Sequence, residues 1–146
     1  MRKLRRAIRT ARLGRALPMS LLLRSATVRR MVLRDAANHG EHLTATQALE
    51  ATRDLLACTV ADDILTTNEE LAPLDPPPCP ITIAWSGDDA LLPVDVNGAT
   101  ARQRVPHARF TVLVGVGHVP MIDDPQNVAR TILQATEADR ELHARP

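Results

Sequence analysis

The chain has 146 residues, of which 45% are apolar and 24% charged. This length suffices for one globular domain with a buried core, and this composition is not that of a disordered protein. Trp85 and Phe110 are its only tryptophan and phenylalanine, and tyrosine is absent, which disfavours a surface that stacks nucleotide bases. The net charge of +1 hides an asymmetry, since positions 1–34 hold eleven basic and no acidic residues, whereas the remaining positions hold seven arginines and all seventeen acids.

This basic segment, positions 1–34, admits several interpretations. A run of positive charge binds nucleic acid or an anionic membrane surface, and an arginine-rich segment without acids also resembles an organellar transit peptide. We favour a solvated helix face, because no aromatic residue interleaves with the arginines. We therefore expect no nucleic-acid partner.

Two further features bear on location. The longest uncharged stretch of the basic segment, Ala16 to Leu23, is interrupted by Pro18 and is too short to span a bilayer. Cys58 and Cys79 are isolated thiols without Cys-x-x-Cys spacing, which is typical of a reducing compartment. The sequence predicts a cytoplasmic protein without a membrane span.

A proline-rich stretch divides the chain. Four prolines between Asp75 and Ile81 cannot lie inside a helix, so we place a helical region at 1–75 and an α/β region at 76–146. In the first region, helical periodicity predicts helices over 2–13 and 19–33. Thr44 predicts the N-cap of a further helix that reaches about Val60, and a shorter helix is expected over 61–70.

After the prolines the apolar pattern becomes that of alternating strands and helices. Residues 81–85 predict a buried strand and residues 110–114 a second strand, and residues 94–104 predict a helix that Gly98 weakens. Asp124-Pro125 predicts the start of a helix that reaches about residue 138. The order strand, helix, strand, helix indicates an α/β fold with a parallel sheet.

Polar residues follow both predicted strands. Asp88 and Asp89 come after the first strand, and His118 comes after the second. The carboxyl ends of parallel strands meet at one edge of a sheet, so we expect these side chains to share a crevice. A histidine beside a carboxylate is the acid–base half of a nucleophilic triad. The alternatives are a loop histidine held by backbone contacts and an aspartate that caps a turn.

The surrounding residues carry a more specific pattern. Asp89 stands four residues before Pro93, and the stretch Gly117-His118-Val119-Pro120 is followed by Asp124-Pro125 and a predicted helix. Over about residues 78–133 the chain resembles the C-terminal portion of the α/β-hydrolase family. The family often has glycine directly after the first of these strands, where this chain has Ser86 and then Gly87.

The resemblance implies a fold and two roles. Asp89 would be the catalytic acid, favoured over Asp88 by its interval to Pro93, and His118 the catalytic base. The α/β region would be a partial α/β-hydrolase core, and the helical region before it the lid. We expect structural roles for the remaining polar and aromatic candidates. His107 would lie in a surface turn, Trp85 in the core, and Asp123 and Asp124 at a helix N-terminus. His39, His42 and His143 lack the spacing of metal ligands. We expect no cofactor and no metal.

A nucleophile is missing from the pattern. The turn Gly-x-Ser-x-Gly, which holds the nucleophile in this family, does not occur in the sequence, whose serines are Ser20, Ser25 and Ser86. The two cysteines lie on no such turn either. The resemblance implies that full-length relatives hydrolyse an ester or a carbon–carbon bond of a small molecule with a nucleophile–His–Asp triad. We expect this chain to be truncated and inactive by itself.

Two expectations about partners follow. A sheet of two strands leaves an unprotected edge on the first strand, which predicts self-association, and a companion chain is one source of the missing nucleophile. The alternative function is a non-catalytic interaction protein whose basic segment binds an anionic partner.

Overall fold

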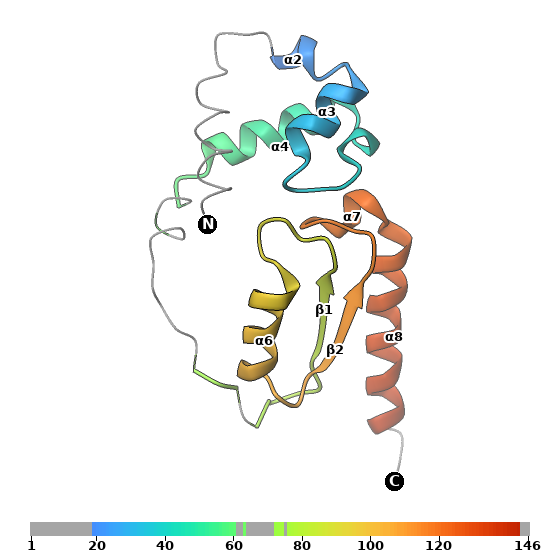
Figure 1. Ribbon diagram of the computed structural model, residues 1–146. Coiled ribbons are helices and arrows are strands. Elements are labelled where there is room, and N and C mark those ends of the chain that lie inside the picture. Colours follow the sequence, from blue (N-terminus) through green and yellow to red (C-terminus); the bar gives the residue numbers. More distant parts are fainter. Residues whose placement is uncertain (1–18, 61–62, 64–71, 75, 144–146) are drawn as a thin grey trace.

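A computed structural model describes residues 19–60, 63, 72–74 and 76–143. Figure 1 shows a helical part that lies against one end of a two-stranded sheet, with α6 and α8 on either side of the strands. In chain order, the described elements are α2 (Met19–Leu22), α3 (Ala26–Leu33), the 3₁₀ turn η2 (Gly40–His42), α4 (Ala45–Ala57), β1 (Thr82–Ser86), the π-helical turn η3 (Val94–Gly98), α6 (Ala99–Arg104), β2 (Arg109–Leu113), α7 (Pro120–Asp123) and α8 (Pro125–His143).

The helix predicted over 19–33 is two helices instead of one. The Ser25 side chain accepts a hydrogen bond from the Val28 backbone N–H and so caps the start of α3. Because this bond competes with continuation of the helix, α2 ends before Ser25. Leu23 is fully buried at the break, and the Arg29 guanidinium donates to the backbone oxygens of Leu23 and Arg24 at 2.8 and 2.9 Å. The helices predicted over 2–13 and 61–70 lie outside the described residues, apart from position 63.

The predicted N-cap at Thr44 is confirmed. Its side chain accepts from the Gln47 backbone N–H, and the Gln47 side chain accepts in turn from the Thr44 backbone N–H at 2.9 Å, which completes a capping box. The helix buries Ala48 and ends at Ala57, before Val60. Reciprocal capping satisfies backbone donors that have no partner inside a helix.

The predicted parallel sheet is also confirmed. β1 pairs in parallel with β2, from Thr82 opposite Arg109 to Ser86 opposite Leu113. The connection between them contains η3 and α6, where the sequence predicts a single helix over 94–104. Gly98 lies at their junction because space is tight there: a Cβ at this position would lie 3.0 Å from the Val94 side chain and 3.2 Å from Phe110.

Two helices follow β2. The short α7 is not predicted by the sequence, whereas α8 begins at Pro125 as expected. The Asp124 carboxylate accepts from the Asn127 backbone N–H at 2.9 Å, so Asp124 performs the predicted role at the helix N-terminus. The start of α8 is therefore fixed by local chemistry.

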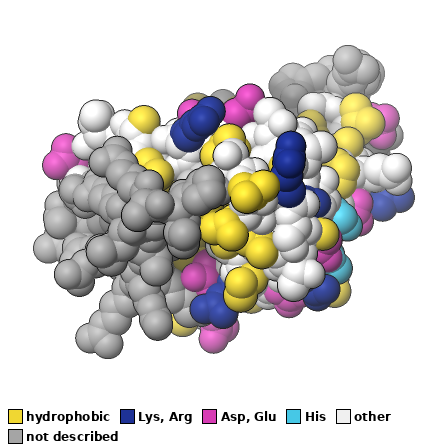
Figure 2. Space-filling view, turned by 90° about the horizontal axis from the view of Figure 1, so that it is seen from above, with side chains coloured by type: hydrophobic (Ala, Val, Ile, Leu, Met, Phe, Trp, Pro, Cys, Tyr) yellow, Lys and Arg dark blue, Asp and Glu magenta, His cyan; other side chains and the backbone are white. Residues whose placement is uncertain are grey.

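The described residues bury little apolar surface. Their buried hydrophobic residues are Leu23, Ala37, Ala48, Leu113 and Val116. Figure 2 views the molecule from the helical side, where hydrophobic side chains lie at the surface among arginine side chains; exposed apolar residues of these helices are Leu21, Leu22, Met31, Val32 and Leu55. Within the described ranges no helix is long and apolar enough to cross a membrane.

The capping box gives a prediction for stability. Thr44→Ala removes the side-chain acceptor for the Gln47 N–H and should lower the free energy of unfolding by about 1 kcal/mol in urea titrations. Thr46→Ala is the matched control, because Thr46 is exposed and lies inside the same helix turn. Equal effects of the two substitutions would show that the capping box does not stabilise the protein.

Candidate acid–base site

The turn after β1 holds the Asp89 carboxylate in one orientation. Its Oδ1 accepts hydrogen bonds from the backbone N–H groups of Leu91 and Leu92 at 2.9 and 2.7 Å, and its side chain is only 6% exposed. The Trp85 indole Nε1–H donates to the Leu92 backbone oxygen at 3.0 Å. The strand and the turn therefore fix the carboxylate together, and they leave Oδ2 available to a further donor.

The loop after β2 brings His118 to that second oxygen. The imidazole Nδ1 lies 2.9 Å from Asp89 Oδ2, and the histidine side chain remains 34% exposed. An ionised carboxylate only accepts hydrogen bonds, so Nδ1 is the donor and carries the proton. In the neutral ring Nε2 is then the basic nitrogen. The two predicted site residues thus meet in the geometry of an acid–base pair.

Asp88 has different partners from Asp89. Its Oδ2 accepts from the Asn38 side-chain amide at 2.9 Å, and its backbone N–H donates to the Val116 oxygen at 3.0 Å. Of the two adjacent aspartates, Asp89 contacts the imidazole of His118, whereas Asp88 bonds to Asn38.

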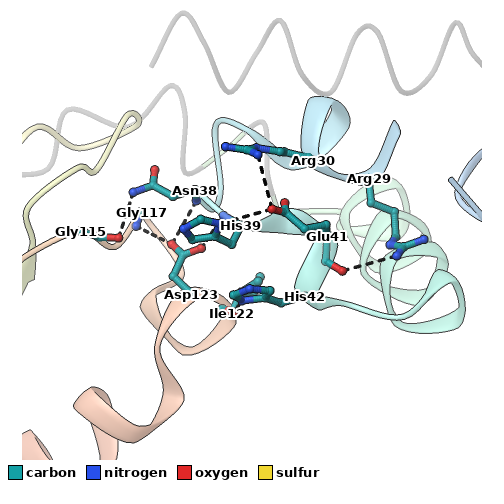
Figure 3. Close-up of polar contacts among 10 residues, drawn as sticks. All are labelled: Arg29, Arg30, Asn38, His39, Glu41, His42, Gly115, Gly117, Ile122 and Asp123. Carbon is teal, nitrogen blue, oxygen red and sulfur yellow. Dashed lines mark hydrogen bonds and ion pairs between the residues drawn. The ribbon is translucent and has the colours of Figure 1, made fainter. Parts of the chain in front are cut away.

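Asp123 behaves differently from the sequence expectation. Instead of capping a helix, its carboxylate accepts three backbone N–H groups: Oδ2 from Gly117 at 2.6 Å and Asn38 at 3.1 Å, and Oδ1 from His39 at 2.7 Å. Figure 3 shows the carboxylate between the loop that leads to His118 and the chain around Asn38. The sequence gives one indication of this role: Asp124 alone suffices to cap α8, so the adjacent Asp123 is not needed at that helix N-terminus.

A second polar cluster adjoins Asp123. The rings of His39 and His42 stack with centroids 5.0 Å apart, His39 Nδ1 lies 3.3 Å from Glu41 Oε1, and Arg30 lies 3.7 Å from the same oxygen. The pKa of Glu41 is lowered, first by a hydrogen bond from its own backbone N–H and then by His39 and Arg30. Within the described ranges no group of three or more His, Cys, Asp or Glu side chains has a metal-binding arrangement.

The other candidates are structural where they are described. His107 is exposed in the turn before β2, as expected. Ser86 is 6% exposed at the end of β1, and Ser25 caps α3. Trp85 stacks on Phe110 with ring centroids 6.4 Å apart but is only partly buried, so it is not one of the buried core residues, contrary to the sequence expectation. The side chain of His143 lies outside the described part of the chain.

A surface hollow of about 610 Å³ lies away from the acid–base pair. Its lining includes Thr82 and Arg109, the first residues of the two strands, and Thr131 and Gln134 of α8. In parallel sheets, substrates bind outside the carboxyl ends of the strands, where Asp89 and His118 stand. This hollow lies at the opposite edge of the sheet, and neither Asp89 nor His118 lines it.

The sequence of the chain matches a model of a known protein family. Residues 2–131 match the family model described as the alpha/beta hydrolase family. No curated protein and no solved structure matches the chain significantly. The family match covers most of the chain, including both residues of the acid–base pair.

The pair gives a prediction for the histidine tautomer. Two backbone N–H groups hold Oδ1 of residue 89, so Asp89→Asn keeps an oxygen there and turns an NH₂ donor toward His118. The imidazole must then accept at Nδ1 and carry its proton on Nε2. Long-range ¹H–¹⁵N spectra should show the Nδ1–H form in the parent and the Nε2–H form in the variant, with a stability loss of about 1–2 kcal/mol.

Asp88→Asn is the matched control for this experiment. It makes the same charge change one residue away and keeps an oxygen acceptor for Asn38, so the spectrum of His118 should not change. An Asp89→Asn spectrum identical to that of the parent would contradict the hydrogen bond between Asp89 and His118.

The lowered pKa of Glu41 gives a prediction for acid stability. A carboxyl group whose pKa lies below its ordinary value of 4.5 in the folded protein stabilises the fold above that value. Its contribution is lost as the pH falls through the folded value. The melting temperature of Glu41→Gln should therefore fall less between about pH 5 and pH 3 than that of the parent. Glu50→Gln, on the exposed side of α4, is the control, and an unchanged acid dependence in Glu41→Gln would refute the prediction.

Proposed function

The chain belongs to the alpha/beta hydrolase family, and from this membership we propose that Asp89 and His118 are the acid and base of a nucleophile–His–Asp triad. The reaction is hydrolysis of an ester or a carbon–carbon bond of a small molecule. The observation that carries the proposal is the 2.9 Å contact between Asp89 Oδ2 and His118 Nδ1, at the carboxyl ends of adjacent parallel strands.

Each partner has a defined task in this reaction. Asp89, with its Oδ1 held by two backbone N–H groups, keeps the proton of His118 on Nδ1 and stabilises the imidazolium that forms later. His118 Nε2 accepts the proton of the attacking nucleophile and then delivers it to the leaving group. In the second half of the reaction, the same nitrogen accepts a proton from the water that releases the product. The partial exposure of His118 leaves access for both partners.

The nucleophile in this proposal comes from polypeptide outside the 146 residues. No Gly-x-Ser-x-Gly occurs in the sequence. The described serines do not lie on a strand-to-helix turn, since Ser86 is buried at the end of β1, Ser25 caps α3 and Ser20 lies within α2. The described sheet contains β1 and β2 alone, so each of these strands pairs along one edge. Such edges accept a further strand, and we infer that the chain associates through them, with itself or with a companion.

We further infer that the helical region, residues 1–75, is a lid over this site. In support, two residues of the helical part bond to the loop that carries His118: the Ala36 backbone oxygen accepts from the Val119 N–H, and the Asn38 side-chain amide donates to the Gly115 oxygen. Helices α2 to α4 also expose apolar side chains such as Met31 and Val32. A lid needs such faces to cover a small apolar substrate. Cys58 and Cys79 are both free thiols, which supports a cytoplasmic location.

The alternative function, binding of an anionic partner by the basic segment, receives less support. Its first seven basic residues lie outside the described residues. Of the described ones, Arg29 donates to the backbone oxygens of Leu23 and Arg24, and Arg30 pairs with Glu41. These two arginines stabilise the fold of the helical part.

The proposed function is tested by ester hydrolysis in two forms of the protein. The 146-residue chain should hydrolyse p-nitrophenyl butyrate no faster than its His118→Ala variant, because a base without a nucleophile forms no acyl intermediate. A longer product of the same gene that carries Gly-x-Ser-x-Gly ahead of this sequence should hydrolyse the ester. Its rate should fall at least about 10³-fold on His118→Ala and on substitution of that serine.

Two results would contradict the proposal. One is turnover by a monomeric, cooperatively folded 146-residue chain that depends on His118. The other is a longer chain whose serine-dependent turnover survives both His118→Ala and Asp89→Asn. Asp88→Asn is the control for the acid and should leave the rate unchanged.

A further inference from the structure

The backbone on both sides of His118 is held by one remote segment of the chain. On one side, the Gly117 N–H donates to Asp123 Oδ2, a carboxylate that also accepts from the Asn38 and His39 N–H groups. On the other side, the Val119 N–H donates to the Ala36 oxygen at 2.8 Å. Residues 36–42, which we name the docking segment, therefore restrain the residues before and after the histidine.

Close packing reinforces these hydrogen bonds. A Cβ at Gly117 would lie 3.0 Å from Ala37 Cα and 3.1 Å from the Asn38 nitrogen, so the docking segment and the histidine loop approach as closely as backbone permits. Ala37 and Val116 are 1% and 2% exposed at this contact. The glycine before His118 is thus required by the docking segment.

The Asn38 side chain connects the same segment to the acid turn. Its amide donates to Asp88 Oδ2 at 2.9 Å and to the Gly115 oxygen at 3.1 Å, as Figure 3 shows for the second contact. Asp88 precedes the acid and Gly115 lies in the loop of the base. One side chain of the docking segment therefore bridges the two loops whose separation sets the distance between Asp89 and His118.

We propose that Asp123 is a positioning residue, which makes the alignment of Asp89 and His118 conditional on the docking segment being in place. The inference rests on the proposed function, since it concerns the regulation of the same acid–base pair. Asp123 contacts neither member of the pair through its side chain. It acts through the backbone N–H of Gly117 on one side and of Asn38 and His39 on the other.

A regulatory consequence follows from this arrangement. The docking segment lies between α3 and α4 and contains η2. A displacement of α3 or α4 therefore also displaces the backbone of Asn38 and His39. Their N–H groups leave Asp123, and the loop of His118 loses its restraint. The helical region then has two roles: as the proposed lid it controls the access of substrate to His118, and through the docking segment it controls the alignment of His118 with Asp89.

The test is Asp123→Asn, read by the tautomer of His118. The amide offers one oxygen where the carboxylate offers two, so at least one backbone N–H faces an NH₂ group and loses its acceptor. The Nδ1–H form of His118 should no longer dominate, and a mixture of tautomers should replace it. Asp123→Glu keeps a carboxylate and should restore part of the parent signal.

Three further variants separate positioning from a loss of stability. Asp124→Asn makes the same change at the neighbouring residue and keeps a good N-cap, so the tautomer should stay that of the parent. Arg102→Ala removes the contact of the guanidinium with the Phe110 ring and so lowers stability at α6, which is neither part of the docking segment nor one of its flanking helices; it should also leave the tautomer unchanged. Asn38→Ala removes exposed side-chain hydrogen bonds and should shift the tautomer even where Asp123→Asn does not fold.

The outcomes distinguish this inference from the proposed function. A tautomer that responds to Asp89→Asn but to neither Asp123→Asn nor Asn38→Ala would overturn the positioning role and leave the acid–base pair intact. A parent chain whose His118 does not carry its proton on Nδ1 would overturn the pair itself. A shift in Asp123→Asn and Asn38→Ala, with none in Asp124→Asn and Arg102→Ala, supports the positioning role.

Discussion

The described structure depends on one carboxylate that satisfies three backbone N–H groups from two distant parts of the chain. Asp123 joins Gly117 to Asn38 and His39, which precede Asp123 by 85 and 84 residues in the sequence. Few side chains in the described part of the chain are fully buried, so apolar burial holds the two parts together only weakly. Charge-assisted hydrogen bonds are stronger than neutral ones. The three hydrogen bonds to Asp123 therefore contribute most where few apolar side chains are buried.

The acid–base pair follows from that constraint together with the sheet. Parallel pairing of β1 with β2 brings the ends of both strands to one edge, and the turn after β1 aims one oxygen of Asp89 away from its own backbone donors. The docking segment then fixes the loop after β2 so that His118 meets this oxygen. A local turn orients Asp89, whereas remote contacts orient the loop that carries His118. We therefore infer that, of the two residues, His118 is the one that a change in the helical part affects.

Features that depend on neighbouring residues could be predicted from the sequence. The cap at Thr44, the start of α8 at Pro125 and the two strands have local causes, and each strand lies within one residue of its expected bounds. The pair of Asp89 and His118 could be predicted because both follow strands within a familiar motif. The role of Asp123 could not, because its partners at Asn38 and His39 are remote in sequence and are backbone groups, which no residue type reveals.

Amide hydrogen exchange of the unmodified chain tests this account most directly. The N–H groups of Gly117, Asn38 and His39 share one acceptor, so they should exchange slowly and at similar opening free energies, comparable to that of Gly87, which donates to Leu113 beside the strands. Rapid exchange of Asn38 and His39 beside a protected Gly117 would contradict the account. It would show that the docking segment detaches while the histidine loop stays in place.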